Sequence, residues 1–259
     1  MNKKMIYASY GIEYKNGKIF APVFGWIPEI LLNGNSKLGD GVYTFSLLPG
    51  ADVFTLVING VEMSTKATCP CNCKGCYAMR GFYNMPSAKK SAFIKTVLAR
   101  EYPEFFKNAI IAQLQACKAE LCRLHESGDF FSSDYIELWK EIVKACPDTA
   151  FWGYTKNKEA EEAFDNIDNC NIVKSVIRGF GFNFGKCGYI LKVYRALTAM
   201  GKSVYICRCG IDKEQHCTNC KGCSKNEFVL FIEHSTGYKA EEDTLFPELK
   251  AIIENQPKI

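Results

Sequence analysis

The stretch LCRLHESGDFFSSDYIELWKEIVKACPDTAFWGYT, residues 121–155, decides the fold class. Its first five residues predict a short strand, which ends in the polar loop ESGDFFSS. Residues 150–155, AFWGYT, predict a second strand. The segment between them, 133–146, has four apolar residues on one helical face: Ile136, Trp139, Ile142 and Val143. A strand, a helix and a strand in this order indicate parallel strands joined by a right-handed crossover.

Helical and strand patterns continue on both sides of this strand-helix-strand unit. Helical spacing is present at 85–100, 103–120, 158–167, 189–201 and 246–255, and strands are expected at 171–177, 203–208 and 228–234. Residues 1–60 differ, because they are rich in glycine, asparagine and aromatic residues with short alternating runs. We predict a β-rich N-terminal extension over 1–60, an α/β unit built as an open sheet or partial barrel over 61–206, and a cysteine-rich region over 207–259.

The composition of the chain limits which classes of protein it can belong to. The chain has 259 residues, of which 47% are hydrophobic, so it is long enough to bury a sizeable core. Its longest apolar runs fall well short of the ~20 residues that span a bilayer, and its start does not have the pattern of a secretory signal. We expect a cytoplasmic protein without a membrane span. The net charge of +4 and scattered lysines give nucleic acid only weak support as a partner.

Fourteen cysteines are unusual for such a protein, and in the cytoplasm a disulfide framework would be reduced. The first cluster lies in CPCNCKGCYA, where Cys69, Cys73 and Cys76 have the spacing C-x3-C-x2-C. Three thiolates so spaced can bind three irons of a 4Fe-4S cube and leave the fourth iron open. Two alternatives remain: Cys71 could close the cluster as a fourth ligand, or four thiolates could hold a tetrahedral zinc ion.

This spacing resembles the signature of the radical S-adenosylmethionine superfamily. The resemblance implies a partial (β/α)6 TIM-like barrel, with Cys69, Cys73 and Cys76 as the catalytic cluster ligands and S-adenosylmethionine bound at the open iron. In that barrel, the apolar run at 53–58, or a short extension of it, would be the strand before the cluster loop. It also implies an electron donor such as flavodoxin or ferredoxin, reductive cleavage of S-adenosylmethionine, and a 5′-deoxyadenosyl radical that acts on a substrate. The sequence does not identify that substrate.

The same resemblance suggests which residues bind the cofactor. The superfamily's second strand ends in a short glycine-rich acidic motif that holds the methionine amino group, and Ser127, Gly128 and Asp129 stand at the matching place. The superfamily's aromatic residue before the third cysteine is Gly75 here, and Tyr77 follows that cysteine instead. Lys156 directly follows the strand at 150–155. At this position it would contact substrate or adenosine.

The second cluster is CRCGIDKEQHCTNCKGCS, residues 207–224, for which we expect a second metal centre. Cys217, Cys220 and Cys223 repeat the ligand spacing of bacterial ferredoxin cubes. The fourth ligand stays open among Cys187, Cys207, Cys209 and His216. A second 4Fe-4S cluster and a zinc knuckle both satisfy this pattern.

Taken whole, the sequence resembles the phage gene product 88 family, which is found in phages and integrative mobile elements. The resemblance is carried by FGWIPEILLNGNSKLGDGVYTFSLLPG, CKGCYAMRGFYN, HESGDFFSSDYIELW, FWGYTKN and CRCGIDKEQHCTNCKGCS. It implies a phage or mobile-element context and no particular activity. We expect an iron-sulfur enzyme of the radical S-adenosylmethionine type. The alternative is a non-catalytic protein, braced by zinc or iron-sulfur centres, that binds nucleic acid or a protein partner.

Overall fold

A mainly parallel five-stranded sheet forms the centre of the computed structural model, which describes residues 2–35, 38–70, 76–175, 184–208, 212, 215–220, 222–232 and 239–256. The strand order is β10-β9-β8-β5-β4. These strands are β4 (Leu32–Asn33), β5 (Val42–Ser46), β8 (Leu121–Ser127), β9 (Ala150–Thr155) and β10 (Cys170–Lys174). Strands β5, β8, β9 and β10 are parallel, and β4 pairs antiparallel with β5 at the edge.

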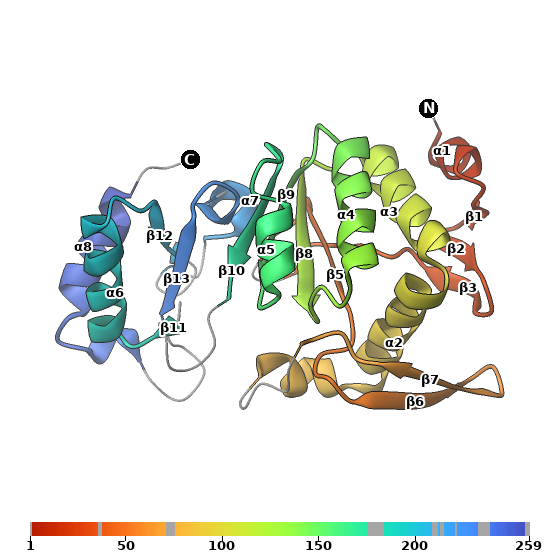
Figure 1. Ribbon diagram of the computed structural model, residues 1–259, viewed down its shortest axis with the longest axis horizontal. Coiled ribbons are helices and arrows are strands. Elements are labelled where there is room, and N and C mark those ends of the chain that lie inside the picture. The colour runs from red at the N-terminus through yellow and green to blue at the C-terminus, as the bar shows by residue number, and fades with distance from the viewer. Residues whose placement is uncertain are drawn as a thin grey trace.

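Helices cover one face of this sheet. They are α2 (Pro86–Glu101), α3 (Pro103–Cys117), α4 (Ser133–Ala145) and α5 (Lys158–Ala163). Helices α3, α4 and α5 lie side by side across that face (Figure 1). Between helices and sheet, the Phe45 ring stacks on Trp139 at 5.4 Å and meets Phe106 edge-on at 5.9 Å, and all three are fully buried. Of the helices in the described ranges, none is long and apolar enough to cross a bilayer.

The N-terminal extension is a short helix followed by a three-stranded antiparallel meander. Its elements are α1 (Lys3–Ser9), β1 (Tyr14–Lys15), β2 (Lys18–Ala21) and β3 (Gly25–Pro28). The sequence pattern had not predicted α1, which begins where the Asn2 side chain accepts a hydrogen bond from the Lys4 amide. Helix α1 packs against α3, so the extension is attached to the helical layer.

One strand assignment was wrong. The apolar run at 53–58 was expected to enter the barrel as the strand before the cysteine loop, but it forms β6 (Val53–Ile58) of a hairpin with β7 (Val61–Lys66). The turn is Asn59-Gly60, with φ of 51° and 80°, the conformation of a tight two-residue hairpin turn. This hairpin extends from the main body (Figure 1). The parallel strand that precedes the cysteines is β5, which the sequence analysis had placed within the N-terminal extension.

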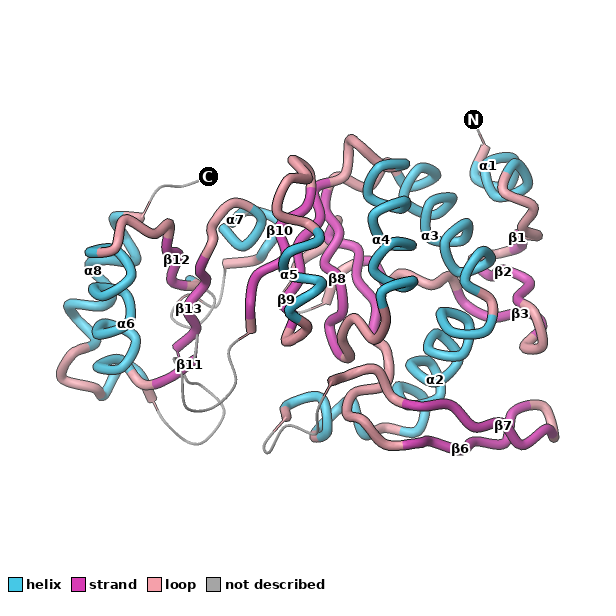
Figure 2. Tube along the Cα trace, viewed as in Figure 1, coloured by secondary structure: helices cyan, strands magenta, loops and turns pink. Residues whose placement is uncertain are grey.

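The C-terminal part has its own small parallel sheet, of order β11-β13-β12. Its elements are β11 (Phe184–Gly185), α6 (Cys187–Ala199), β12 (Val204–Ile206), α7 (Cys217–Cys220), β13 (Phe228–Ile232) and α8 (Phe246–Asn255). Helices α6 and α8 lie together beside this sheet (Figure 2). The α/β class is confirmed, but the described strands form four separate sheets, of which the five-stranded one and this one contain parallel strands, and none of them closes into a barrel.

A single buried amide ties the chain after β3 to helix α3. The Gln113 side chain accepts a hydrogen bond from the Leu31 amide and donates one to the Leu31 carbonyl, both at 2.8 Å. Gln113 is buried, so water cannot replace it.

We predict that Gln113→Leu lowers the free energy of unfolding by about 2–4 kcal/mol, because both backbone groups of Leu31 lose their partner. Urea denaturation followed by circular dichroism measures this. Gln115→Leu on the same helix is the matched control, since Gln115 bonds at the surface with Tyr10, and it should cost less than about 1 kcal/mol. Equal losses in the two variants would contradict the role of the amide.

Candidate functional site

The candidate site lies at the carboxyl ends of β5, β8 and β9. After β5 and the hairpin, the chain returns to this edge at Cys69, whose amide donates to the Gly50 carbonyl at 2.8 Å. Cys69 and Cys76 are both partly exposed. Cys73, and Cys71 with it, lie outside the described residues. The structure therefore places the two ends of the predicted cluster loop at the sheet edge where ligands bind in open α/β folds.

The loop after β8 is bonded directly to the residue before Cys69. The Thr68 hydroxyl donates to the Leu48 carbonyl at 2.9 Å and accepts from the Asp129 amide at 3.1 Å. The Ser127 hydroxyl donates to the Leu47 carbonyl at 2.8 Å, and the Leu47 amide donates to the Ser127 carbonyl at 2.9 Å. These bonds bring the predicted Ser-Gly-Asp motif and the start of the cysteine loop into contact.

Gly128 is the point of closest approach. Its φ is +84°, a left-handed conformation that favours glycine. A Cβ atom there would lie 2.5 Å from Thr68 Oγ1 and 2.8 Å from Leu47 Cβ. Any side chain at this position would push the two loops apart.

The Asp129 carboxylate joins the ends of β8 and β9. It accepts hydrogen bonds from the Thr155 hydroxyl at 2.6 Å, the Phe130 amide at 2.8 Å and the Lys156 amide at 2.9 Å. Burial raises the pKa of Asp129, and these hydrogen bonds act in the opposite direction. Because the carboxylate is buried and bonded to its own chain, it acts here by positioning Lys156 and the Gly128 loop.

A polar group that the sequence analysis did not single out lies beside this edge. Glu126 Oε1 accepts from Asn35 Nδ2 at 2.7 Å and from the Tyr83 hydroxyl at 3.1 Å. The Tyr77 hydroxyl donates to the Glu126 carbonyl, which ties Tyr77 to the end of β8. Lys95 is buried nearby, and burial lowers its pKa to about 8, with the Glu126 charge opposing that shift.

A bulge in β8 creates this arrangement. Along β5, Thr44 pairs with Arg123 and Ser46 pairs with Ser127, so two residues of β5 match four of β8. His125 takes up the extra length with a φ of +49°. No local sequence signal gives this shift of register, which is why Glu126 was missed.

His125 itself belongs to the core. Its ring lies 5.2 Å from Phe45 and 4.6 Å from Phe130, and its Nε2 is 3.0 Å from the Tyr135 hydroxyl. Burial lowers the pKa of His125 to about 3. It is therefore a neutral, packed histidine at neutral pH.

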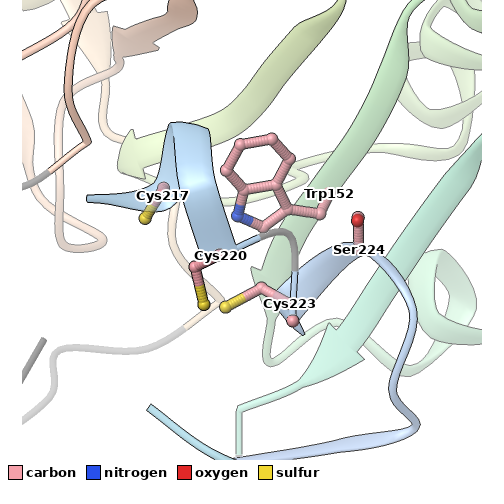
Figure 3. Close-up of a pocket in the computed structure, with 6 residues that line it drawn as sticks. Trp152, Cys217, Cys220, Cys223 and Ser224 are labelled. Carbon is pink, nitrogen blue, oxygen red and sulfur yellow. The ribbon is translucent and has the colours of Figure 1, made fainter. Parts of the chain in front are cut away.

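The second cysteine cluster covers the opposite face of the sheet. Cys220 and Cys223 are buried, and their thiols point toward one another beneath Trp152 of β9 (Figure 3). The Tyr205 hydroxyl lies 2.9 Å from Cys220 Sγ. A Cβ atom on Gly222 would lie 2.4 Å from the Tyr205 ring, so Gly222 packs directly against that ring.

The structure separates the proposed fourth ligands of this cluster. Cys207 and Cys217 pack against the same apolar group as Cys220 and Cys223. Cys187 belongs to a different core, formed with α6 and α8. His216 lies against Gly39, and Cys209 is outside the described residues. Cys207 is thus better placed than Cys187.

Within the ranges that the structure describes, no three cysteine, histidine, aspartate or glutamate side chains are arranged to hold a metal ion. The donors gathered at the second cluster are thiols, which suit zinc or iron-sulfur centres and not magnesium or calcium.

Fold and site define an α/β protein that brings a cysteine loop and a glycine-containing acidic loop together at the carboxyl edge of a parallel sheet. The chain belongs to the gene product 88 family, whose model matches residues 29–177, more than half of the chain. The matched region runs from β4 through β10 and includes the first cysteine loop and the Ser-Gly-Asp motif.

Two mycobacteriophage proteins are similar to parts of the chain. The gene 88 protein of phage L5 is 37% identical over 65 residues, which are 25% of this chain and 26% of that protein. The gene 88 protein of phage D29 is 39% identical over 41 residues, 16% of this chain and 17% of its own length. The similar stretches thus span about a quarter and a sixth of those relatives. No solved structure matches significantly.

We predict that Gly128→Ala lowers the free energy of unfolding by about 2–4 kcal/mol, through a strained φ and the clash with Thr68. Gly201→Ala is the matched control, because Gly201 also has a positive φ, +73°, but a Cβ there meets nothing within 4 Å. It should cost only about 1 kcal/mol. Chemical denaturation of both variants measures the difference, and similar losses would exclude a tight contact at Gly128.

His125 makes the free energy of unfolding depend on pH. As pH falls below about 6.5, a histidine in the unfolded chain binds a proton while buried His125 does not, so the free energy of unfolding falls by about 1.4 kcal/mol per pH unit. His125→Asn, which tolerates the left-handed backbone, should lose stability at pH 7 and flatten the decline between pH 6.5 and 5. Urea titrations at several pH values test this, and an unchanged slope would contradict it.

Proposed function

We propose that the chain is an iron-sulfur enzyme of the radical S-adenosylmethionine type. Cys69, Cys73 and Cys76 would hold a 4Fe-4S cluster. The contact of Gly128 and Asp129 with Thr68 carries the proposal, because it joins the Ser-Gly-Asp loop to the cysteine loop at the ends of neighbouring parallel strands. The partial (β/α)6 barrel of that superfamily would begin with β5, β8, β9 and β10 in this order.

The chain's own residues would bind and orient the cofactor. When bound, the cluster would supply the electron that cleaves S-adenosylmethionine, and a flavodoxin or ferredoxin would reduce the cluster. Gly128 would keep the Ser-Gly-Asp loop close to Thr68 and so to the cysteine loop, and Ser127 and Asp129, whose side chains bond internally, would act as positioning residues. Tyr77 and the half-buried Lys156 would border the site on either side.

The second centre would hold zinc or another cluster with Cys207, Cys217, Cys220 and Cys223, and with Cys209 as the other candidate. Support comes from Cys207, Cys217, Cys220 and Cys223, which pack around one apolar group on the face of the main sheet opposite the helices. Bound there, a metal would brace the C-terminal sheet against Trp152.

One observation favours the alternative, a non-catalytic protein braced by metal centres. The Asp129 carboxylate is fully engaged inside the protein, which suits a structural loop as well as a cofactor-binding one. The competing proposal differs from the first in metal content and in reactivity toward S-adenosylmethionine.

Anaerobic purification with counts of iron, sulfide and zinc tests the first site. We expect about four irons per chain, or about eight if the second centre is also a cube. Cys69→Ala, Cys73→Ala and Cys76→Ala should each lose about four irons, whereas Cys117→Ala, a partly exposed cysteine beside Lys3, should lose none. Zinc without sulfide in the wild-type protein would exclude the enzyme.

Activity is tested by reducing the cluster-replete protein with dithionite in the presence of S-adenosylmethionine. The expected product is 5′-deoxyadenosine, and it should be absent from the three cysteine variants. If only Cys71→Ala forms it, the first cluster is closed by Cys71 in the natural protein. No product from any replete form would favour the non-catalytic alternative.

The proposed second metal centre is tested separately, by variants of its own cysteines. Cys220→Ala and Cys223→Ala should remove one metal centre and speed limited proteolysis of the C-terminal region, because the brace is lost. Cys187→Ala, in the other core, should weaken packing without changing the metal count. An unchanged metal count in the first two variants would contradict a second centre.

A further inference from the structure

Lysines and arginines are spread along the whole chain, but acidic residues are absent from the stretch around the first cysteine loop. Between Glu62 and Glu101 there are seven lysines and arginines and no aspartate or glutamate. The rest of the chain holds 25 basic residues against all 28 acidic ones. The overall charge of +4 is therefore the sum of a strongly basic segment between Glu62 and Glu101 and a slightly acidic remainder.

Several of these cations are exposed and without ion pairs. Arg80, Lys89 and Lys90 lie at the surface in the segment from the loop after Cys76 to the first turns of α2. None of the three forms an ion pair with a described residue, whereas nine other lysines and arginines do: Lys3, Lys107, Lys140, Lys158, Lys174, Arg195, Lys202, Lys239 and Lys250. Within the part of the chain that the structure describes, no acidic side chain pairs with these three cations.

Exposed aromatic rings belong to the same segment as these cations. Phe82 is 84% exposed and Tyr77 is 57% exposed. The segment is held by local bonds, from Asn84 Nδ2 to the Met79 carbonyl at 2.6 Å and from the Met85 amide to the Phe82 carbonyl at 3.1 Å. An almost fully exposed phenylalanine on a segment of fixed conformation is a surface that a partner can cover.

We propose that this basic aromatic collar, Tyr77, Arg80, Phe82, Lys89 and Lys90, binds single-stranded nucleic acid. Lysine and arginine neutralise backbone phosphates, and exposed aromatic rings stack on unpaired bases. A duplex would offer its phosphates but keep its base faces hidden, and an acidic protein would match the cations but have no base to stack on Phe82. Charge and rings together fit a single strand.

The collar begins at the residue after Cys76, so it places nucleic acid at the mouth of the candidate site. As an assignment of substrate class, the inference rests on the proposed function. As an assignment of a binding surface it does not, because equilibrium binding requires neither reductant nor S-adenosylmethionine. A failure of the enzyme assay and a failure of nucleic-acid binding are therefore distinguishable.

Fluorescence anisotropy of the anaerobically purified full chain with labelled 20-nucleotide single-stranded DNA and RNA tests the proposal. Matched duplexes and poly-glutamate serve as competitors. We expect a single strand to bind more tightly than its duplex, poly-glutamate to compete poorly, and affinity to fall steeply with salt.

Two variants distinguish the contribution of the positive charges to affinity from that of the Phe82 ring. Arg80→Gln/Lys89→Gln/Lys90→Gln should lower affinity at least tenfold and reduce the salt slope by about 2, since each phosphate contact on a single strand contributes roughly 0.7. Phe82→Ala should lower affinity about tenfold at an unchanged slope, because it removes stacking alone.

Each variant has a matched control. Arg195→Gln/Lys239→Gln/Lys250→Gln removes the same charge from exposed sites in the C-terminal part, and Phe20→Ala removes another exposed ring. Both controls should keep wild-type affinity, and circular dichroism checks folding. The proposal is overturned by absent binding, by equal losses in variants and controls, by duplex preference, or by tighter binding of poly-glutamate, which would indicate an acidic protein partner.

Discussion

The hydroxyl group of Thr68 holds the functional edge of this protein together. It bonds to the end of β5 through Leu48 and to the loop after β8 through Asp129, and Gly128 leaves just enough room for it. Asp129 in turn bonds to Thr155 and Lys156 at the end of β9. Three parallel strands are thus joined at their carboxyl ends by one buried network, and the cysteine loop starts from its centre.

The sheet is covered on both faces, with different chemistry on each. Helices and aromatic rings fill one face, where Phe45 and Trp139 stack. The other face carries Trp152 and the thiols of Cys220 and Cys223, which join the C-terminal part to the main sheet. Arg123 lies on β8 with its guanidinium 5.8 Å from the Tyr154 ring, and its buried Nε has no hydrogen-bond partner in the described ranges. That face is also largely apolar, but it adds thiols and a buried arginine to its hydrophobic side chains.

The sequence predicts much of this architecture, because its helices and inner strands have clear periodicity. Strand β9 was placed at its observed bounds, and helices α2 and α4 within one residue of theirs. The Ser-Gly-Asp motif was singled out by its resemblance to the radical S-adenosylmethionine superfamily, whereas its contact with Thr68 is seen only in the structure. The hairpin β6–β7 was missed although Asn59-Gly60 signals it, since its apolar run looked like a buried strand. Glu126 could not be predicted, because a bulge at His125 turns it to the site, and bulges depend on pairing between distant segments.

The central claim is that three thiolates beside Thr68 hold a cluster with one iron open to S-adenosylmethionine. Electron paramagnetic resonance of the dithionite-reduced protein, recorded with and without S-adenosylmethionine, tests it most directly. The account predicts the signal of a reduced 4Fe-4S cluster that changes when S-adenosylmethionine is added and is lost in Cys69→Ala. A signal that S-adenosylmethionine leaves unaltered, or no cluster signal at all, would contradict it.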